Sequence, residues 1–309
     1  MIEFWKCARG FKQIEQWEPD AWVLVTQPEP EELERLEEQF KVPLDYIHDV
    51  EDQGERPRID TDEGWFTTIL RIPDKFVDED GEVAFATRPM AVLIREDVAI
   101  TVCWFRPEMI DDLIQFSNRK QIAERKGLDF ISTFFVSSAV WFLRYLKLMN
   151  QKMEDIEDAL EKSMDNEELR AMMRIEKYLV YFITTLRGNE VVLERFKRML
   201  PGKTYDEDLL EDASIELHQA YSTANIYSDI LERQREAYSS IITNNLNAVM
   251  QRLTVITLIL MLPACVSGFL GMNVMNGIET WPFAFPAIFG LTVLICVVAY
   301  YMLKRRRML

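Results

Sequence analysis

The C-terminal part of the chain carries almost no charge. Between Leu253 and Leu303 the only charged side chain is Glu279. Four adjacent cations follow directly, and they are Lys304, Arg305, Arg306 and Arg307. Water-soluble folds rarely hold so long a segment with a single charge. The tail is therefore expected to be buried in lipid or deep within protein.

Two uncharged stretches in this tail have the length of a membrane span. As helices, residues 253–270 would extend about 27 Å and residues 283–303 about 31 Å, close to the roughly 30 Å hydrocarbon core of a bilayer. Cations after the second stretch favour a cytoplasmic C-terminus, and two spans return the N-terminus to the same side. We expect a two-span protein of the cytoplasmic (inner) membrane, with an outer loop at 271–282 and a basic cytoplasmic tail at 304–309. The alternative is a buried helical hairpin in a soluble core.

The rest of the chain is strongly acidic. The net charge is −16, and because the tail contributes +3, residues 1–252 carry −19. Nucleic-acid binding requires a clustered basic surface, so no nucleic-acid partner is expected. The N-terminus lacks the basic and apolar pattern of a signal peptide, and this acidic body is therefore expected to stay in the cytoplasm.

The sequence holds no recognisable catalytic motif. It contains no GxxxxGK[ST] phosphate loop, no HExxH pair and no nucleophile elbow. Its four cysteines are widely spaced and form no CxxC pair, so neither a zinc ribbon nor a disulfide framework is supported. We therefore expect no enzymatic activity, no catalytic residue and no catalytic cofactor.

Proline divides the acidic body into two regions. Eight of the twelve prolines lie at or before Pro107, whereas residues 108–262 contain Pro201 alone. We expect a cytoplasmic α/β domain over residues 1–126, with a helix at 31–39 and a hairpin turn at Asp80–Gly81. Strands are expected where β-branched and aromatic residues cluster, at Ile2–Cys7, Trp22–Gln27, Trp65–Arg71, Val83–Thr87, Ala91–Ile94 and Val98–Cys103.

The second region is expected to be helical throughout. Residues 127–204 predict an antiparallel hairpin of helices at 129–163 and 167–200. Residues 205–270 meet no proline before Pro263. One long stalk helix is therefore expected there, continuing into the first membrane span.

One face of this long helix has an unusual composition. Met261, Thr257, Thr254, Met250 and Asn247 follow one another at steps of three and four, which keeps them on one side. Hydroxyl groups and methionines alternate there, unlike the leucine and isoleucine surface that suits lipid. A ring of such helices would line an axial path with an apolar constriction. The alternative is that these small and polar residues pack one membrane helix on another.

A short motif follows the first uncharged stretch. Gly271-Met272-Asn273 stands directly after it, with Glu279 six residues beyond the asparagine. The triplet lies between two C-terminal spans, after a long uninterrupted helix and before a closing group of cations. In this arrangement the chain resembles the CorA family of divalent-cation channels, and the resemblance covers essentially the whole sequence.

The resemblance implies a homopentamer with a funnel-shaped cytoplasmic part and a pore lined by the first span of each subunit. It implies a selectivity motif at Gly271, Met272 and Asn273, with Asn273 engaging a hydrated ion and Glu279 at the outer mouth. The pore-lining positions that it implies are Asn247, Met250, Leu253 or Thr254, Thr257, Met261 and Ala264. These nearly coincide with the helix face described above.

The resemblance also implies cytoplasmic metal sites between subunits that hold the pore shut. Asp212 matches one such position by its distance from the motif, and Asp78 and Asp80 are candidate partners from the α/β domain. The acidic stretch 154–168 is either a solvated surface or a region whose repulsion responds to Mg²⁺.

Mg²⁺ suits the side chains of this expected pore. The ion sheds water reluctantly, so a pore that accepts it hydrated should offer amide and backbone oxygens rather than a cage of carboxylates. The leading hypothesis is an influx channel for Mg²⁺, gated by intracellular divalent cation. The alternatives are a Zn²⁺ or Co²⁺ transporter of the same architecture and, from another class, a membrane-anchored acidic scaffold protein.

Overall fold

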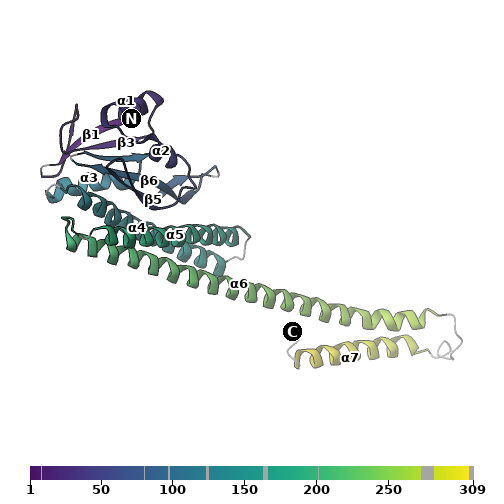
Figure 1. Ribbon diagram of the computed structural model, residues 1–309. Helices are drawn as coiled ribbons and strands as arrows, with labels where there is room; N and C mark the ends of the chain where they lie inside the picture. Colours follow the sequence, from purple (N-terminus) through teal and green to yellow (C-terminus); the bar gives the residue numbers. More distant parts are fainter. Residues whose placement is uncertain are drawn as a thin grey trace. The chain divides into compact units, whose positions relative to one another are not determined.

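The computed structural model describes residues 1–7, 9–79, 81–96, 98–122, 125–162, 166–200, 202–272 and 282–305. The chain divides into two compact units, Met1–Glu232 and Arg233–Leu309. The division falls within one helix, α6 (Glu207–Leu270). Figure 1 labels the elements, and each unit is described by itself.

The first unit contains a seven-stranded mixed sheet with the order β2-β1-β3-β7-β6-β5-β4. Strands β3 and β7 pair in parallel, and the other neighbours pair antiparallel. The strands are β1 (Ile2–Cys7), β2 (Phe11–Ile14), β3 (Ala21–Thr26), β4 (Arg58–Asp62), β5 (Trp65–Val77), β6 (Val83–Arg95) and β7 (Val98–Cys103).

Helices cover both faces of the sheet. Helices α1 (Pro30–Phe40) and α2 (Leu44–Asp49) lie on one face, and α3 (Glu108–Lys120), α4 (Leu128–Lys162) and α5 (Asn166–Met199) lie on the other (Figure 1). All six residues of β3 are buried, as expected of a strand that is covered on both sides. The fold is therefore an α/β sandwich followed by long helices, as the sequence predicts.

Successive side chains of β3 pack alternately against the helices on the two faces of the sheet. Val23 belongs to the same apolar cluster as Leu36 and Phe40 of α1. The neighbouring Trp22 points to the other side, where its ring centroid lies 5.6 Å from that of Phe130 and 6.0 Å from that of Phe134, both on α4. The alternation follows from the two-residue period of a strand.

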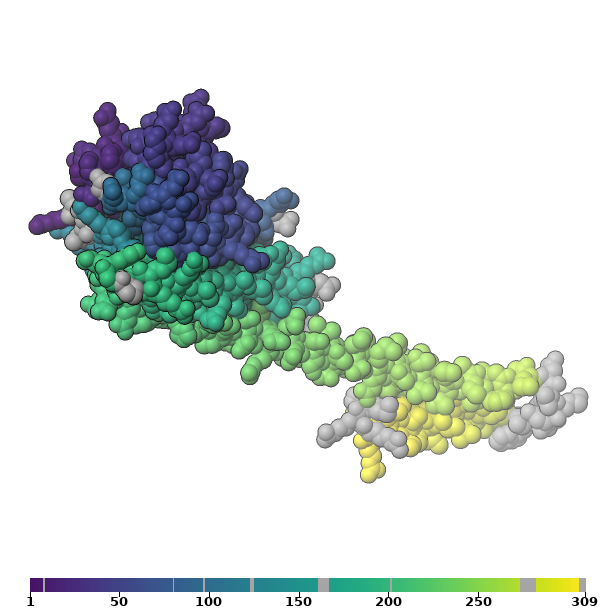
Figure 2. Space-filling model, viewed as in Figure 1, coloured from purple at the N-terminus to yellow at the C-terminus, as the bar shows by residue number. Residues whose placement is uncertain are grey.

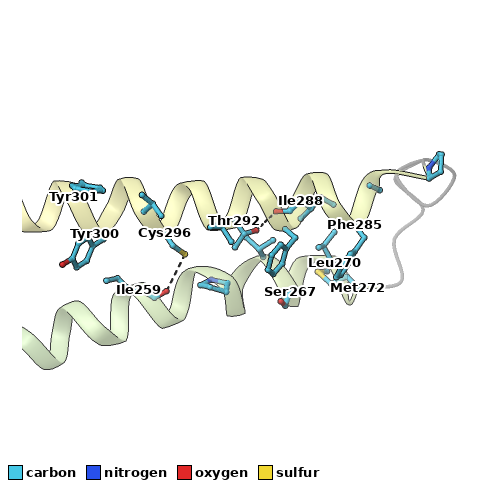
Figure 3. Close-up of a pocket in the computed structure, with 17 residues that line it drawn as sticks. Ile259, Ser267, Leu270, Met272, Phe285, Ile288, Thr292, Cys296, Tyr300 and Tyr301 are labelled. Carbon is cyan, nitrogen blue, oxygen red and sulfur yellow. Dashed lines mark hydrogen bonds between the residues drawn. The ribbon is translucent and has the colours of Figure 1, made fainter.

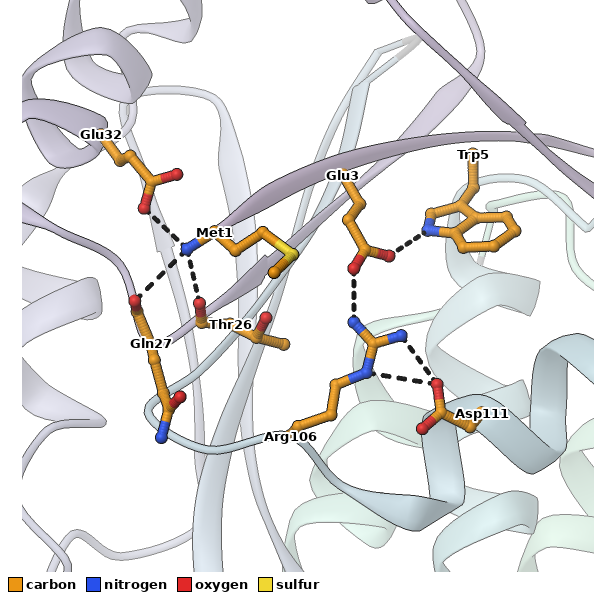
Figure 4. Close-up of polar contacts among 8 residues, drawn as sticks. All are labelled: Met1, Glu3, Trp5, Thr26, Gln27, Glu32, Arg106 and Asp111. Atoms are coloured by element: carbon orange, nitrogen blue, oxygen red, sulfur yellow. Dashed lines mark hydrogen bonds and ion pairs between the residues drawn. The ribbon is translucent and has the colours of Figure 1, made fainter.

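Polar contacts link the N-terminus and β1 to β3, to α1 and to the segment before α3 (Figure 4). The amino group of Met1 donates to the Thr26 carbonyl oxygen at 2.7 Å and to Glu32 Oε2 at 2.7 Å. Burial acts to raise the pKa of Glu32, but its hydrogen bonds, chiefly from this amino group, hold the pKa below its ordinary value. Arg106, just before α3, pairs with Glu3 of β1 at 2.6 Å.

Asn189 of α5 completes the hydrogen bonding of β5. Its side-chain oxygen accepts from the Arg71 backbone N–H at 3.2 Å, and its amide nitrogen donates to the Arg71 carbonyl oxygen at 2.8 Å. The last β4–β5 pair joins Arg58 to Ile69, so Arg71 lies beyond the end of β4. The fully buried Asn189 therefore stands where a neighbouring strand would otherwise continue.

The structure corrects the predicted strands in two places. The strand expected at Trp65–Arg71 continues to Val77 as β5. The segments Val83–Thr87 and Ala91–Ile94 were expected to be separate, but they belong to one strand, β6. Pro89 is tolerated between them because its nitrogen faces away from β5, and β7 pairs with β6 only from Ala91 onward. The short edge strands β2 and β4 and the helix α2 were not predicted, because their few apolar residues give no clear period. Helix α3 was not predicted either.

Helix α6 begins where the sequence indicates. Asp206 precedes its first residue, and Asp206 Oδ1 accepts from the Leu209 N–H at 3.2 Å, which satisfies one of the free donors of the first turn. In the first unit its buried side chains recur mostly at steps of three, four and seven. They are Leu209, Leu210, Ala213, Leu217, Ala220, Ala224 and Leu231. The second helix of the C-terminal unit, α7, spans Ala284–Arg305.

Candidate pore face and membrane helices

The C-terminal unit presents two helices that are long and apolar enough to cross a membrane. The apolar window of α6 is 6% buried within the chain, and that of α7 is 0% buried. A single copy therefore leaves this apolar surface without protein cover. Lipid or further subunits must cover it.

Helix α7 packs against one particular side of α6, as Figures 2 and 3 show. Val255 of α6 is 1% exposed, and Ile259, Leu262 and Val266 are half-buried at following steps of four and three. The Cys296 thiol of α7 lies 4.0 Å from the Ile259 carbonyl oxygen. These residues mark the α7-facing side of α6.

The predicted pore-lining residues all lie away from that side. Met250 is 54% exposed, Leu253 56% and Met261 60%, and Asn247, Thr254, Thr257 and Ala264 are exposed as well. Successive residues of a helix are turned by about 100° around its axis. The mean direction of these seven side chains is therefore about 140° around α6 from the α7-facing side. We refer to these residues as the pore face.

Two threonines of the pore face have a defined hydrogen-bonding role. The Thr254 hydroxyl donates to the Met250 carbonyl oxygen at 2.8 Å, and the Thr257 hydroxyl donates to the Leu253 carbonyl oxygen at 2.8 Å. Each hydroxyl proton is thus used within the helix, and the oxygen retains its capacity to accept. Water bound to a cation points its hydrogens outward, so acceptors of this kind match a hydrated ion.

The structure describes the first part of the predicted selectivity motif. Gly271 follows the last residue of α6, and its N–H donates to the Ser267 carbonyl oxygen at 2.9 Å. Met272 is 58% exposed and borders the groove between α6 and α7. Asn273 and Glu279 lie outside the described residues.

Cations lie at the C-terminal end of α7. Lys304 and Arg305 are exposed in its last turn, whereas Arg306 and Arg307 lie outside the described residues. Sequence reasoning missed a further cation, Arg252 of α6, which is also exposed. It is the last charge before the first uncharged stretch, a signal that the sequence already contains.

The candidate regulatory carboxylates lie in the first unit. Asp212 is exposed on α6. Asp78 is half-buried in the β5–β6 hairpin, where its Oδ1 accepts from the Glu82 backbone N–H at 2.8 Å. Asp80 lies outside the described residues. Within the described part of one chain, no group of three or more histidine, cysteine, aspartate and glutamate side chains could hold a metal ion.

A second carboxylate of the first unit, besides Glu32, has a shifted pKa. Burial raises the pKa of Asp74 on β5 above its ordinary value, and the Arg88 guanidinium at 2.7 Å opposes this effect only in part. Glu108 of α3 adds to the increase through its negative charge. This pair lies in the sheet domain and forms no part of the pore face.

Comparison with known proteins gives consistent results. The sequence profile of a family described as "CorA-like Mg2+ transporter protein" matches residues 20–305. The cobalt/magnesium transport protein CorA of Methanocaldococcus jannaschii is 25% identical over 290 residues, which cover 92% of this chain and 90% of that protein. The protein of the same name from Thermotoga maritima is 21% identical over 286 residues, covering 90% of this chain and 80% of that protein.

The fold agrees with a solved structure along almost its whole length. The complete structure of the CorA magnesium transporter from M. jannaschii superimposes with a TM-score of 0.86 at 22% identity. The match covers 99% of this chain and 98% of that chain. The long helix and the two apolar helices therefore belong to a fold that a known membrane transporter also adopts.

Proposed function

The chain belongs to the family of CorA-like Mg²⁺ transporter proteins, two-span membrane transporters of divalent cations, and on this premise we propose that it is an influx channel for Mg²⁺. The pore is formed by the pore face of α6 from each of five subunits. The Asn273 amides engage the hydrated ion at the outer mouth, beside Glu279. Both chain termini lie in the cytoplasm, as the cations at Lys304 and Arg305 favour.

The exposure of the pore face is the observation that carries this proposal. Helix α7 covers the opposite side of α6, which leaves Asn247, Thr254, Thr257 and Met261 free to face an axis. An anchor helix would gain nothing from such a row of acceptors and thioethers on a lipid-facing side. A pore would gain a polar threshold at Asn247 and an apolar constriction at the methionines.

We further propose that intracellular divalent cation closes the channel. Asp212 from one subunit and Asp78 or Asp80 from the next supply carboxylate ligands, the oxygen donors that Mg²⁺ prefers. The net charge of −19 on residues 1–252 raises the local concentration of cations around such a site. The ligands come from two subunits, so the site forms only in the assembly.

Cobalt is the second candidate cargo. Two of the curated relatives are named cobalt/magnesium transport proteins. Proteoliposomes containing the full chain should therefore be tested with Mg²⁺, Co²⁺, Zn²⁺ and Ni²⁺ side by side. Uptake of Mg²⁺ at the lowest concentration supports the proposal, preference for Co²⁺ or Zn²⁺ changes the assigned cargo, and no uptake of any ion favours the scaffold.

Two matched pairs of variants separate the pore from its alternatives. Asn273→Ala should lower uptake at least tenfold without changing assembly, whereas Asn276→Ala, a control in the same loop, should retain it. Thr257→Cys should be blocked by a charged thiol reagent. Ile256→Cys, which is also exposed in one chain but lies about 100° away on the helix, should not be blocked. Equal behaviour within either pair contradicts the role proposed for that residue.

A further inference from the structure

An apolar groove runs between α6 and α7 on the side away from the pore face (Figure 3). Its volume is about 1020 Å³. Ile259 and Val266 line it from α6, and Phe289, Val293 and Val297 line it from α7. Tyr300 and Tyr301 border it near the end of α7.

The two helices bring cations to the same end of this groove. Ile259 is level with Cys296, as their 4.0 Å contact shows, and because the helices are antiparallel, Arg252 is level with Leu303. Lys304 follows Tyr300 by four residues and thus continues the groove-lining row of α7. Arg252 lies about 60° from the centre of the α7-facing side of α6, on the flank that also carries Ile259.

These two cations have no ion-pair partner among the residues that the structure describes. Arg252 and Lys304 are both exposed, and the titratable side chains within four residues of Lys304 on α7 are Tyr300, Tyr301 and the cation Arg305. The end of the groove is therefore positively charged in a chain whose net charge is −16. Phenolic hydroxyl groups beside it can donate hydrogen bonds to an anion.

We propose that this groove binds one anionic phospholipid, with its phosphate between Arg252 and Lys304 and an acyl chain along the apolar wall. From Tyr300 to Phe289 the wall extends about 17 Å, close to the roughly 15 Å depth of one leaflet. The charge at the polar end selects an anionic headgroup over a zwitterionic one. With both termini in the cytoplasm, as in the proposed function, the lipid belongs to the inner leaflet.

Lipid titration of the full-length protein tests this directly. Phosphatidylglycerol or phosphatidylcholine is added to the detergent-solubilised protein, and bound lipid is counted by native mass spectrometry. Arg252→Gln combined with Lys304→Gln should weaken phosphatidylglycerol binding about 30-fold, at roughly 1 kcal/mol per cation near a lipid surface. Arg233→Gln, an exposed cation on α6 that is distant from the groove, should leave binding unchanged.

A second variant distinguishes lipid from another occupant. Val293→Trp fills the groove, and it should abolish phosphatidylglycerol binding while the assembly retains its mass. Dissociation of the assembly would instead show that a second copy fills the groove, and it would overturn the proposal. Equal binding of phosphatidylcholine, or full binding by the double glutamine variant, would also overturn it. The readout is lipid bound rather than ion flux, so failure of the proposed channel function leaves this test intact.

Discussion

The side chain of Asn189 provides a quantitative test of how the sheet domain holds α5. Asn189→Ala removes both hydrogen bonds to the Arg71 backbone, at 3.2 and 2.8 Å. It leaves one N–H and one carbonyl group of β5 unpaired beneath a helix. An unsatisfied buried polar group costs about 1–3 kcal/mol. Because Arg71 is half-buried, we expect a total loss of about 2–4 kcal/mol.

Thermal unfolding of the full-length protein in detergent measures this loss. Each kcal/mol corresponds to about 2–4 °C in a unit of this size, so the Tm should fall by about 4–16 °C. Asn189→Asp separates the two bonds, since a carboxylate can accept from the Arg71 N–H but cannot donate to its carbonyl oxygen. This variant should be at least as unstable as Asn189→Ala at pH 7. It should recover stability in acid, where the protonated carboxyl group can donate.

Thr184→Ala is the matched control on the same helix. The Thr184 hydroxyl is exposed and donates only to the Val180 carbonyl oxygen at 2.8 Å. Its removal should change stability by no more than about 0.5 kcal/mol. If Asn189→Ala unfolds within 2 °C of Thr184→Ala, roughly the shift expected for 0.5–1 kcal/mol, the inference that this carboxamide replaces a strand is wrong.

Two further predictions concern carboxylates of the first unit. Burial raises the pKa of Asp74 above its ordinary 3.8, so the folded state binds this proton more tightly than the unfolded state. Its contribution to stability is complete below pH 3.8 and is lost as pH rises through the raised pKa. The free energy of unfolding of the parent protein, relative to that of Asp74→Asn, should therefore fall as the pH rises from 3.8 through the raised pKa. A difference that does not change with pH would contradict burial as the cause of the shift. Asp212→Lys should weaken both the closure of the channel by Mg²⁺ and the protection of the protein from protease by Mg²⁺. Glu211 is the exposed neighbour of Asp212 on α6, and Glu211→Lys should change neither. Equal protection in both variants would exclude Asp212 as a ligand.

The membrane part shows what a sequence can specify unaided. Hydropathy and length are one-dimensional properties, and the bilayer imposes a fixed thickness, so both spans could be predicted from composition alone. The long helix could likewise be predicted, because no proline precedes Pro263 in it. The strands β1 and β7 were predicted with their observed bounds, since each is a compact run of β-forming residues.

Other features depend on neighbours that the local sequence does not reveal. Pro89 interrupts the pattern of a strand, and only the sheet order shows that its nitrogen faces an unpaired edge. Asn189 reads as an ordinary polar residue in a helix, and only its position over Arg71 identifies its role. The bonds concerned join residues 118 positions apart.

The sequence by itself determined that the chain has an acidic body, a long helix and two spans. Charge, proline content and apolar length are properties of the local sequence and do not depend on tertiary contacts. The sequence also marked the row of threonines and methionines on α6. The tertiary structure decided which side of α6 packs on α7, a choice that hydropathy does not make among the several apolar sides of this helix. The same packing brings Arg252 and Lys304 to one end of a groove, since antiparallel helices place residues level with each other that are far apart in the chain.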